Sequence, residues 1–216
     1  MMELFVDNHS MAVLTYALVS VLAFAVYLFL LDHPTSLGRT LSKTLAVATL
    51  AVMAWAVGGP LLLVVALALS ALGDAFLAHE GDVAFLGGLG SFLVAHVLYA
   101  VLFIGSGDGF TGSTIPGVLA VAAFAVTIGF VMVRKAGPLA LPVAAYVLAI
   151  ASMGLGGVTL GGQVLAGVVL FMASDAILGS EKFLMAEDDQ LRKVSAPAVW
   201  VLYYSGQLLI THGLLA

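Results

Sequence analysis

The chain has 216 residues, of which 62% are hydrophobic and only 9% are charged, and its formal net charge is -5. This composition excludes an ordinary soluble domain and favours an integral membrane protein, in which apolar runs of about 20 residues cross the bilayer as helices. The few charges are too diffuse to indicate a nucleic-acid partner, and the lack of cysteine excludes disulfides and thiolate metal ligands.

Eight apolar runs can be placed along the chain, and the alternating pattern of membrane β-barrel strands is absent. We therefore predict an all-α fold, a polytopic membrane helical bundle with eight transmembrane helices in one domain over residues 1–216. Residues 1–10 lack a basic region, so the first run is interpreted as a retained span. Glycine-rich segments at 58–60, 106–113 and 154–162 are expected to end helices. The predicted spans are residues 11–31, 40–57, 60–78, 84–104, 115–133, 138–154, 161–180 and 197–215.

The basic residues predict the orientation of these spans. All seven lie in connections that follow odd-numbered spans: Arg39, Lys43, Arg134, Lys135, Lys182, Arg192 and Lys193. The positive-inside rule makes those connections cytosolic and both termini extracytosolic, and we expect the cell (inner) membrane as the location. Spans one to four and five to eight then run in the same directions. Asp74 on the third span then corresponds to Asp175 on the seventh, and each begins an Asp-Ala-(Phe/Ile)-Leu tetrad. This suggests a 4+4 parallel repeat, although chance similarity in an Ala/Leu-rich chain explains two such short matches equally well.

Two aspartates interrupt apolar, membrane-length segments. Asp74 lies in LALSALGDAFLA, residues 67–78, and Asp175 lies in VLFMASDAILG, residues 169–179. An ionisable side chain in the hydrocarbon costs roughly 3 kcal/mol or more unless it faces a polar interior. A helical rise of 1.5 Å per residue puts both carboxyl groups roughly 9 Å below the cytosolic boundary. Each aspartate is therefore a candidate functional residue.

Polar residues at helical spacing accompany these aspartates on several spans, and such stripes should converge inside a membrane bundle. We predict a polar cavity in the cytosolic half. Interhelical hydrogen bonds worth only about 0.6 kcal/mol are the competing explanation for the Ser, Tyr and Gln residues. His96 alone would be a satisfied core histidine, and Lys43 is equally well explained as a snorkelling anchor. The stripes comprise Ser70 with Asp74, Phe92 with His96 and Tyr99, Ser174 with Asp175, and Tyr203 with Gln207.

Several familiar sites are excluded by the sequence. His79-Glu80 is followed by Gly-Asp-Val, which is not a zinc-protease motif, and no Gly-x-Ser-x-Gly segment occurs. A metal site would need more ligands than two carboxylates and one histidine at different depths. We expect neither a metal nor another cofactor.

Four segments together resemble the lysoplasmalogenase family, the YhhN-like and TMEM86-like group of eight-span membrane proteins. They are Ser-x-x-Gly-Asp ending at Asp74, Gly-Leu-x-x-Phe-x-x-x-His-x-x-Tyr from Gly88 to Tyr99, Phe-x-x-Ser-Asp ending at Asp175, and Tyr-Tyr-x-x-Gln-x-x-Ile from Tyr203 to Ile210. Pro142 and Tyr146 are similar to a further family position.

The resemblance implies hydrolysis of the vinyl-ether bond of a lysoplasmalogen, or of a related lysolipid, with a lysophospholipid and membrane lipids as the partners. Protonation of the vinyl ether needs an acid, and the resulting cation needs an anion. Asp74 and Asp175, if close together, would supply both, because two neighbouring carboxyl groups do not both ionise cheaply. A proton-coupled transporter of small molecules or lipids, or a non-catalytic lysolipid-binding protein, remains the alternative. The sequence does not indicate an oligomeric state. The predicted catalytic residues are Asp74, Asp175 and His96, and the predicted substrate-binding residues are Lys43, Ser70, Phe92, Tyr99, Tyr146, Ser174, Tyr203, Tyr204 and Gln207.

Overall fold

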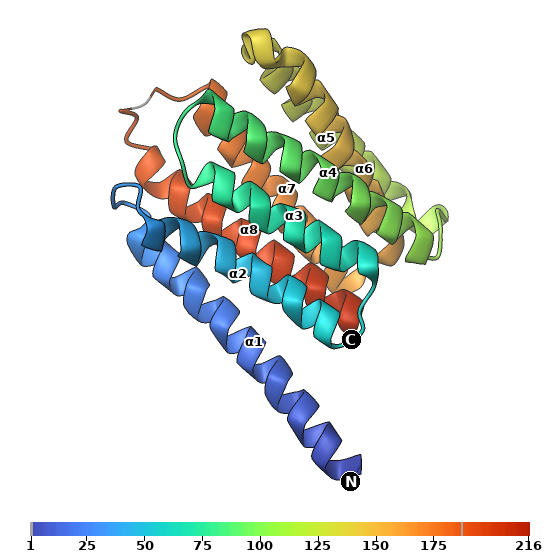
Figure 1. The fold of residues 1–216 in the computed structure, drawn as a ribbon. Helices are drawn as coiled ribbons and strands as arrows, with labels where there is room; N and C mark the ends of the chain where they lie inside the picture. Colours follow the sequence, from blue (N-terminus) through green and yellow to red (C-terminus); the bar gives the residue numbers. More distant parts are fainter. Residues whose placement is uncertain (1, 187) are drawn as a thin grey trace. The chain divides into compact units, whose positions relative to one another are not determined.

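The computed structural model describes residues 2–186 and 188–216, and this part of the chain is built from helices without any strand (Figure 1). The predicted all-α class is confirmed. Two short 3-10 turns, η1 (Gly112–Thr114) and η2 (Gly137–Leu139), precede the fifth and sixth α-helices. The eight α-helices are α1 (Met2–Leu30), α2 (Leu37–Ala56), α3 (Leu61–Leu77), α4 (Asp82–Ser106), α5 (Ile115–Lys135), α6 (Ala140–Leu160), α7 (Gly162–Phe183) and α8 (Arg192–Leu215).

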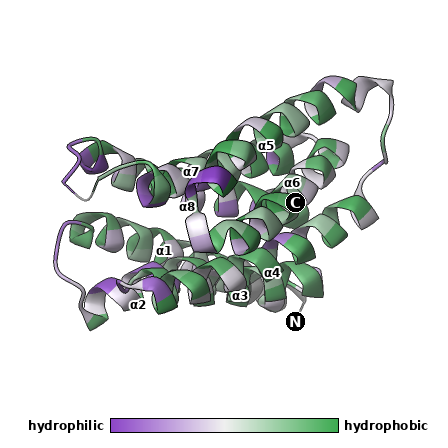
Figure 2. Ribbon diagram, turned by 90° about the horizontal axis from the view of Figure 1, so that it is seen from above, coloured by the Kyte–Doolittle hydropathy of each residue, from purple (hydrophilic) through white to green (hydrophobic). Residues whose placement is uncertain are grey.

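Five of the described helices are long and apolar enough to cross a membrane. They are α1 from Met11 onward, α4, α5 together with η1, α6 together with η2, and α7, while α3 is a shorter apolar helix. Hydrophobic residues cover most of the helical ribbon, and hydrophilic residues are prominent in connections such as that between α1 and α2 (Figure 2). The chain is thus a multi-pass membrane protein, in which exposed apolar side chains face lipid instead of water.

One predicted helix break is wrong. Residues 154–162 were expected to form a glycine-rich turn, but α6 continues to Leu160 and only Gly161, with φ 67°, separates it from α7. The glycines serve close packing instead. A Cβ added at Gly156 would lie 2.9 Å from the Cβ of Phe103, and one added at Gly157 would lie 2.9 Å from Val168. Membrane helices use small residues in this way to bring their backbones together.

Other helix ends differ less from the predicted spans. The glycine-rich segments at 58–60 and 106–113 do separate helices, as predicted. Helix α1 begins nine residues earlier than the predicted span, at Met2 rather than Met11. Helix α8 begins at Arg192 and contains Pro197. The charged connection between α7 and α8 is therefore shorter than residues 181–196, because helices extend from both sides into it.

The chain divides into two compact units, and the boundary between them falls inside α4. Unit 1 runs up to Ala95 and includes Leu214–Ala216. In it α1 packs on α2 and α2 packs on α3. The first half of α4 packs on α3, where the Ser91 hydroxyl donates to the Leu69 carbonyl at 2.6 Å. The ring of Phe92 occupies the space that a side chain at Gly73 would need.

Unit 2 comprises His96–Gly213. In it α5 packs on α6 and α6 packs on α7. Helices α7 and α8 approach closely at two glycines, because a Cβ added at Gly167 would lie 2.7 Å from the Gly206 carbonyl oxygen, and the reverse distance is also 2.7 Å. The single membrane domain and the 4+4 repeat both stay predictions.

Candidate functional site

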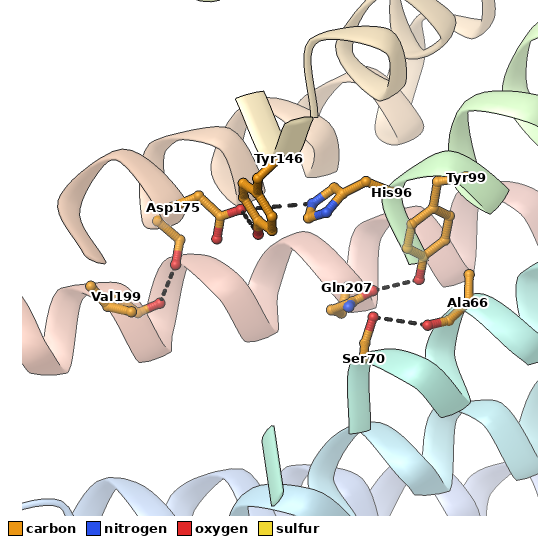
Figure 3. Close-up of polar contacts among 9 residues, drawn as sticks. Ala66, Ser70, His96, Tyr99, Tyr146, Asp175, Val199 and Gln207 are labelled. Carbon is orange, nitrogen blue, oxygen red and sulfur yellow. Dashed lines mark hydrogen bonds and ion pairs between the residues drawn. The ribbon is translucent and has the colours of Figure 1, made fainter. Parts of the chain in front are cut away.

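Asp175 is the centre of a polar cluster inside unit 2. Tyr146 projects from the second turn of α6, and its hydroxyl donates a hydrogen bond of 2.5 Å to Asp175 Oδ2 on α7. The Nε2 atom of His96, on α4, lies 3.7 Å from the same oxygen. That distance is too long for a direct hydrogen bond but short enough for electrostatic interaction. Three helices thus bring a phenol, an imidazole and a carboxyl group together (Figure 3).

Aromatic rings fix the orientation of the His96 imidazole. His96 is fully buried. The Tyr146 ring meets it edge-on at 5.1 Å between centroids, and the Phe171 ring does so at 4.8 Å. Such edge-to-face contacts are among the preferred arrangements of paired rings. The imidazole is therefore held beside Asp175 by packing on two sides.

A fully buried hydrogen bond lies one turn further along α4. The Tyr99 hydroxyl donates to Gln207 Oε1 on α8 at 2.6 Å, and both side chains are fully buried (Figure 3). The other amide atom, Gln207 Nε2, is buried and has no hydrogen-bond partner within residues 2–186 and 188–216. A buried amide N–H group without an acceptor is costly, so this donor is suited to an oxygen of a bound molecule or an ordered water.

The remaining predicted residues of unit 2 pack between α7 and α8 or along α8. The Ser174 hydroxyl donates to the Val199 carbonyl at 2.9 Å. The Tyr203 ring meets Phe171 edge-on at 5.1 Å, and Tyr204 packs against Trp200 at 6.1 Å. Contacts within the fold are therefore enough to explain why these three side chains are buried. A role of Ser174, Tyr203 and Tyr204 in substrate binding stays a prediction.

Asp74 lies in unit 1 and has a different kind of neighbour. Lys43 Nζ, on α2, is 4.0 Å from Asp74 Oδ1, on α3, and these side chains are 13% and 2% exposed. The ammonium group of Lys43 therefore stabilises a negative charge on Asp74 in a site from which water is largely excluded. A snorkelling role does not require such a partner.

The residues around Asp74 explain how its helix is packed. Ser70, one turn earlier, donates to the Ala66 carbonyl of its own helix at 2.9 Å, so its hydroxyl already has an acceptor. Gly73 lets the ring of Phe92 pack against the backbone directly before Asp74. Phe92 thus shapes this site by apolar contact, and a role for Phe92 or Ser70 in binding stays a prediction.

Two residues next to Lys43, Tyr27 and Arg39, were not among the predicted site residues. Tyr27 of α1 is buried, and its ring centroid lies 5.4 Å from Lys43 Nζ and 6.0 Å from the guanidinium carbon of Arg39. The spacing of Arg39 and Lys43, four residues apart, was the available signal, because such residues share one face of a helix.

Comparisons with known proteins agree with the sequence motifs. The model of the YhhN family matches residues 38–214, a range that contains every predicted site residue. The human protein named lysoplasmalogenase TMEM86B is 33% identical over 199 residues, which are 88% of this chain and 82% of the human protein. No solved structure matches the chain.

Proposed function

Because the chain belongs to the YhhN family, we propose that it is a membrane-embedded hydrolase that cleaves the vinyl-ether bond of lysoplasmalogens. The products would be a fatty aldehyde and a glycerophospho-alcohol. The relative named lysoplasmalogenase supports this activity. The observation that carries the proposal is Asp175, a carboxyl group in a membrane-spanning helix that contacts a phenol and lies beside an imidazole.

The chemistry needs a carboxylic acid and a carboxylate. The acid protonates the vinyl carbon that does not carry the ether oxygen, and the electrons of the double bond form the new C–H bond. The resulting oxocarbenium ion is attacked by water, which gives its proton to the carboxylate. The hemiacetal then collapses: its hydroxyl proton returns to the first carboxylate, the C–O bond breaks, and the second carboxyl group protonates the leaving oxygen. Both groups regain their starting states, as in glycoside hydrolysis.

The neighbours of the two aspartates favour one assignment of these roles. Asp74 has an ammonium group beside it, which stabilises the anion that the oxocarbenium ion and the attacking water require. Asp175 has the Tyr146 phenol, which can orient its carboxyl group, and the His96 imidazole, which can accept a proton from that group or return one to it. We therefore assign Asp175 as the proton donor and Asp74 as the anion.

The other predicted residues take supporting roles in this proposal. His96 and Tyr146 orient the Asp175 carboxyl group. Gln207 Nε2, held through the Tyr99 hydrogen bond, offers a donor to an oxygen of the substrate or of the attacking water. Lys43 binds the substrate phosphate in addition to its contact with Asp74. We place the site in the cytosolic half of the cell (inner) membrane, following the distribution of basic residues.

Incubation of the purified protein with a lysoplasmalogen, followed by measurement of fatty aldehyde, tests the activity directly. Asp74→Asn and Asp175→Asn should each abolish most turnover while leaving the thermal unfolding temperature in detergent close to that of the parent. The double variant should be little worse than either single variant, because residues that act in one mechanism are strongly non-additive. Asp108→Asn changes an exposed carboxyl group and is the matched control.

Two results would contradict the proposal. Near-normal turnover in either aspartate variant would remove that residue from the mechanism. Binding of the lysolipid without any release of aldehyde would favour the non-catalytic lysolipid-binding protein instead.

A further inference from the structure

Two cations on α2 share one aromatic ring in unit 1. Arg39 and Lys43 are one turn apart, and both lie over the buried ring of Tyr27 on α1. The distances of 6.0 and 5.4 Å to the ring centroid are within the range of cation–π attraction. Tyr27 therefore holds two positive charges on one side of α2, although like charges at this spacing repel each other.

The position of Arg39 is fixed by the start of the helix. Ser36 is the N-cap of α2, and its hydroxyl accepts a hydrogen bond of 3.3 Å from the Arg39 backbone N–H. Arg39 Nη1 donates to the His33 carbonyl at 3.4 Å, which is long for a hydrogen bond of a charged donor. The side chain is thus placed beside Lys43 by its own helix cap, with most of its donors uncommitted.

Several polar groups near Arg39 and Lys43 have no hydrogen-bond partner among the described residues. Arg39 Nε and the hydroxyl groups of Thr40 and Thr44 are buried and have no hydrogen-bond partner in the described part of the chain. Lys43 has a carboxylate partner in Asp74, which lies 4.0 Å from it. No carboxylate of the described residues forms an ion pair with Arg39. One positive charge therefore remains uncompensated.

We propose that Arg39 and Lys43, held over Tyr27, form the site that binds the phosphate of the lysolipid substrate, and this inference rests on the proposed function. A phosphodiester carries one negative charge, which matches the uncompensated positive charge. The planar guanidinium fork suits two phosphate oxygens, and the Lys43 ammonium supplies a point charge. Tyr27 is a positioning residue in this arrangement, because it orients both cations without touching the phosphate.

The arrangement also relates the phosphate to the proposed chemistry. Lys43 contacts Asp74 on one side, so a phosphate bound between Lys43 and Arg39 directs the glycerol of the same lipid toward Asp74. Binding energy from a group remote from the reacting bond would thereby orient that bond. A phosphate-free monoalkenyl glycerol would lack this contact and should be a poor substrate.

Ligand binding to an inactive variant tests this inference separately from catalysis. We would measure affinity of full-length Asp175→Asn for a lysophospholipid with a saturated ether chain, which has no vinyl bond to cleave. The same ether glycerol without phosphate, inorganic phosphate, and water-soluble glycerophosphoethanolamine are the comparison ligands. Each is read out as a concentration-dependent rise in the unfolding temperature, which follows from binding to the folded state.

Arg39→Ala and Lys43→Ala should each weaken binding of the ether lysophospholipid by about tenfold or more, since each removes a hydrogen bond between charged groups. Neither should change binding of the phosphate-free ether glycerol. Arg39→Lys keeps the charge that sets topology but loses the planar fork, so it should fold normally and recover only part of the affinity. Tyr27→Leu should weaken phosphate-dependent binding with the same selectivity.

Arg134→Ala is the matched control. Arg134 also lies over an aromatic ring, that of Phe130 at 4.7 Å, and belongs to the same predicted cytosolic face. Its loss should leave the affinity for the ether lysophospholipid unchanged. If Arg134→Ala lost as much affinity as Arg39→Ala, the loss would be explained by general surface charge, and the inference would be overturned.

The remaining outcomes separate the two proposals. If Arg39→Ala binds the ether lysophospholipid as tightly as its parent while the wild-type protein hydrolyses lysoplasmalogen, the phosphate site is refuted and the proposed function stands. If binding depends on Arg39 but no aldehyde is ever released, the phosphate site stands and the proposed function fails. Arg39-dependent stabilisation by inorganic phosphate, without any by the ether lysophospholipid, would identify a site for free phosphate and overturn the assignment to a lipid.

Discussion

Removal of one hydroxyl group tests the proposed role of the Tyr146–Asp175 pair. Tyr146→Phe deletes the donor of the 2.5 Å hydrogen bond and keeps the ring that meets His96 edge-on. The change therefore removes the polar contact while it retains the aromatic packing.

The expected loss follows from that contact. A negative charge develops on Asp175 as it gives up its proton in the transition state. A hydrogen bond to a charged group contributes about 1.5 to 3 kcal/mol, and each 1.36 kcal/mol in an activation barrier changes the rate about tenfold. If the hydrogen bond orients the Asp175 carboxyl group in the transition state, kcat should fall about 10- to 150-fold. The Michaelis constant should change much less, because the contact does not involve the substrate.

The assay is release of fatty aldehyde from a lysoplasmalogen in detergent micelles at saturating substrate, with the unfolding temperature measured on the same samples. Tyr16→Phe is the control, because Tyr16 lies on α1 outside the candidate site. A kcat for Tyr146→Phe within experimental error of the parent would refute the reasoning. A large drop in unfolding temperature with unchanged kcat would assign the hydrogen bond to folding.

Three further predictions concern topology, packing and the imidazole. A reporter fused to the C-terminus should be active only outside the cytosol, because every Lys and Arg lies at or near a helix end that the positive-inside rule predicts to be cytosolic; activity of a cytosol-specific reporter there would contradict this orientation. Gly206→Val should destabilise the protein by about 1 to 3 kcal/mol through overpacking against Gly167, whereas Gly90→Ala, in open space on α4, should not; thermal unfolding in detergent would compare them. His96→Ala should lower kcat while Asp175 and Tyr146 stay paired; unchanged turnover would make the histidine a packing residue.

The sequence was sufficient to predict the helices but not all of their ends. Apolar runs long enough to cross a bilayer leave the backbone little alternative to a helix, because unpaired peptide groups are too costly there. Glycine, by contrast, has two uses that a single sequence does not distinguish. Gly58 and Gly59 end a helix, whereas Gly154 and Gly157 remain inside α6 and let neighbouring side chains approach.

Helical spacing likewise predicted which residues share a face, but it did not predict which faces meet. Positions four apart on α4 placed Phe92 and His96 on one stripe. The Tyr146–Asp175 hydrogen bond joins α6 to α7, and Tyr146 was included only through the family resemblance. Tyr27 was overlooked because an aromatic residue in an apolar span is normally core, and its contact with two cations depends on how α1 packs against α2.

The two aspartates share a short sequence pattern, yet their neighbours differ in charge, and this difference argues against a purely structural role. A carboxylate that served packing alone would be expected to have a neutralising partner, since an uncompensated charge sheltered from water is destabilising. Asp74 has such a partner in Lys43, but Asp175 is accompanied by a phenol that donates to it and by an imidazole that can take up a proton. We therefore propose that the two environments serve a reaction that needs one carboxylate as an anion and one carboxyl group as an acid.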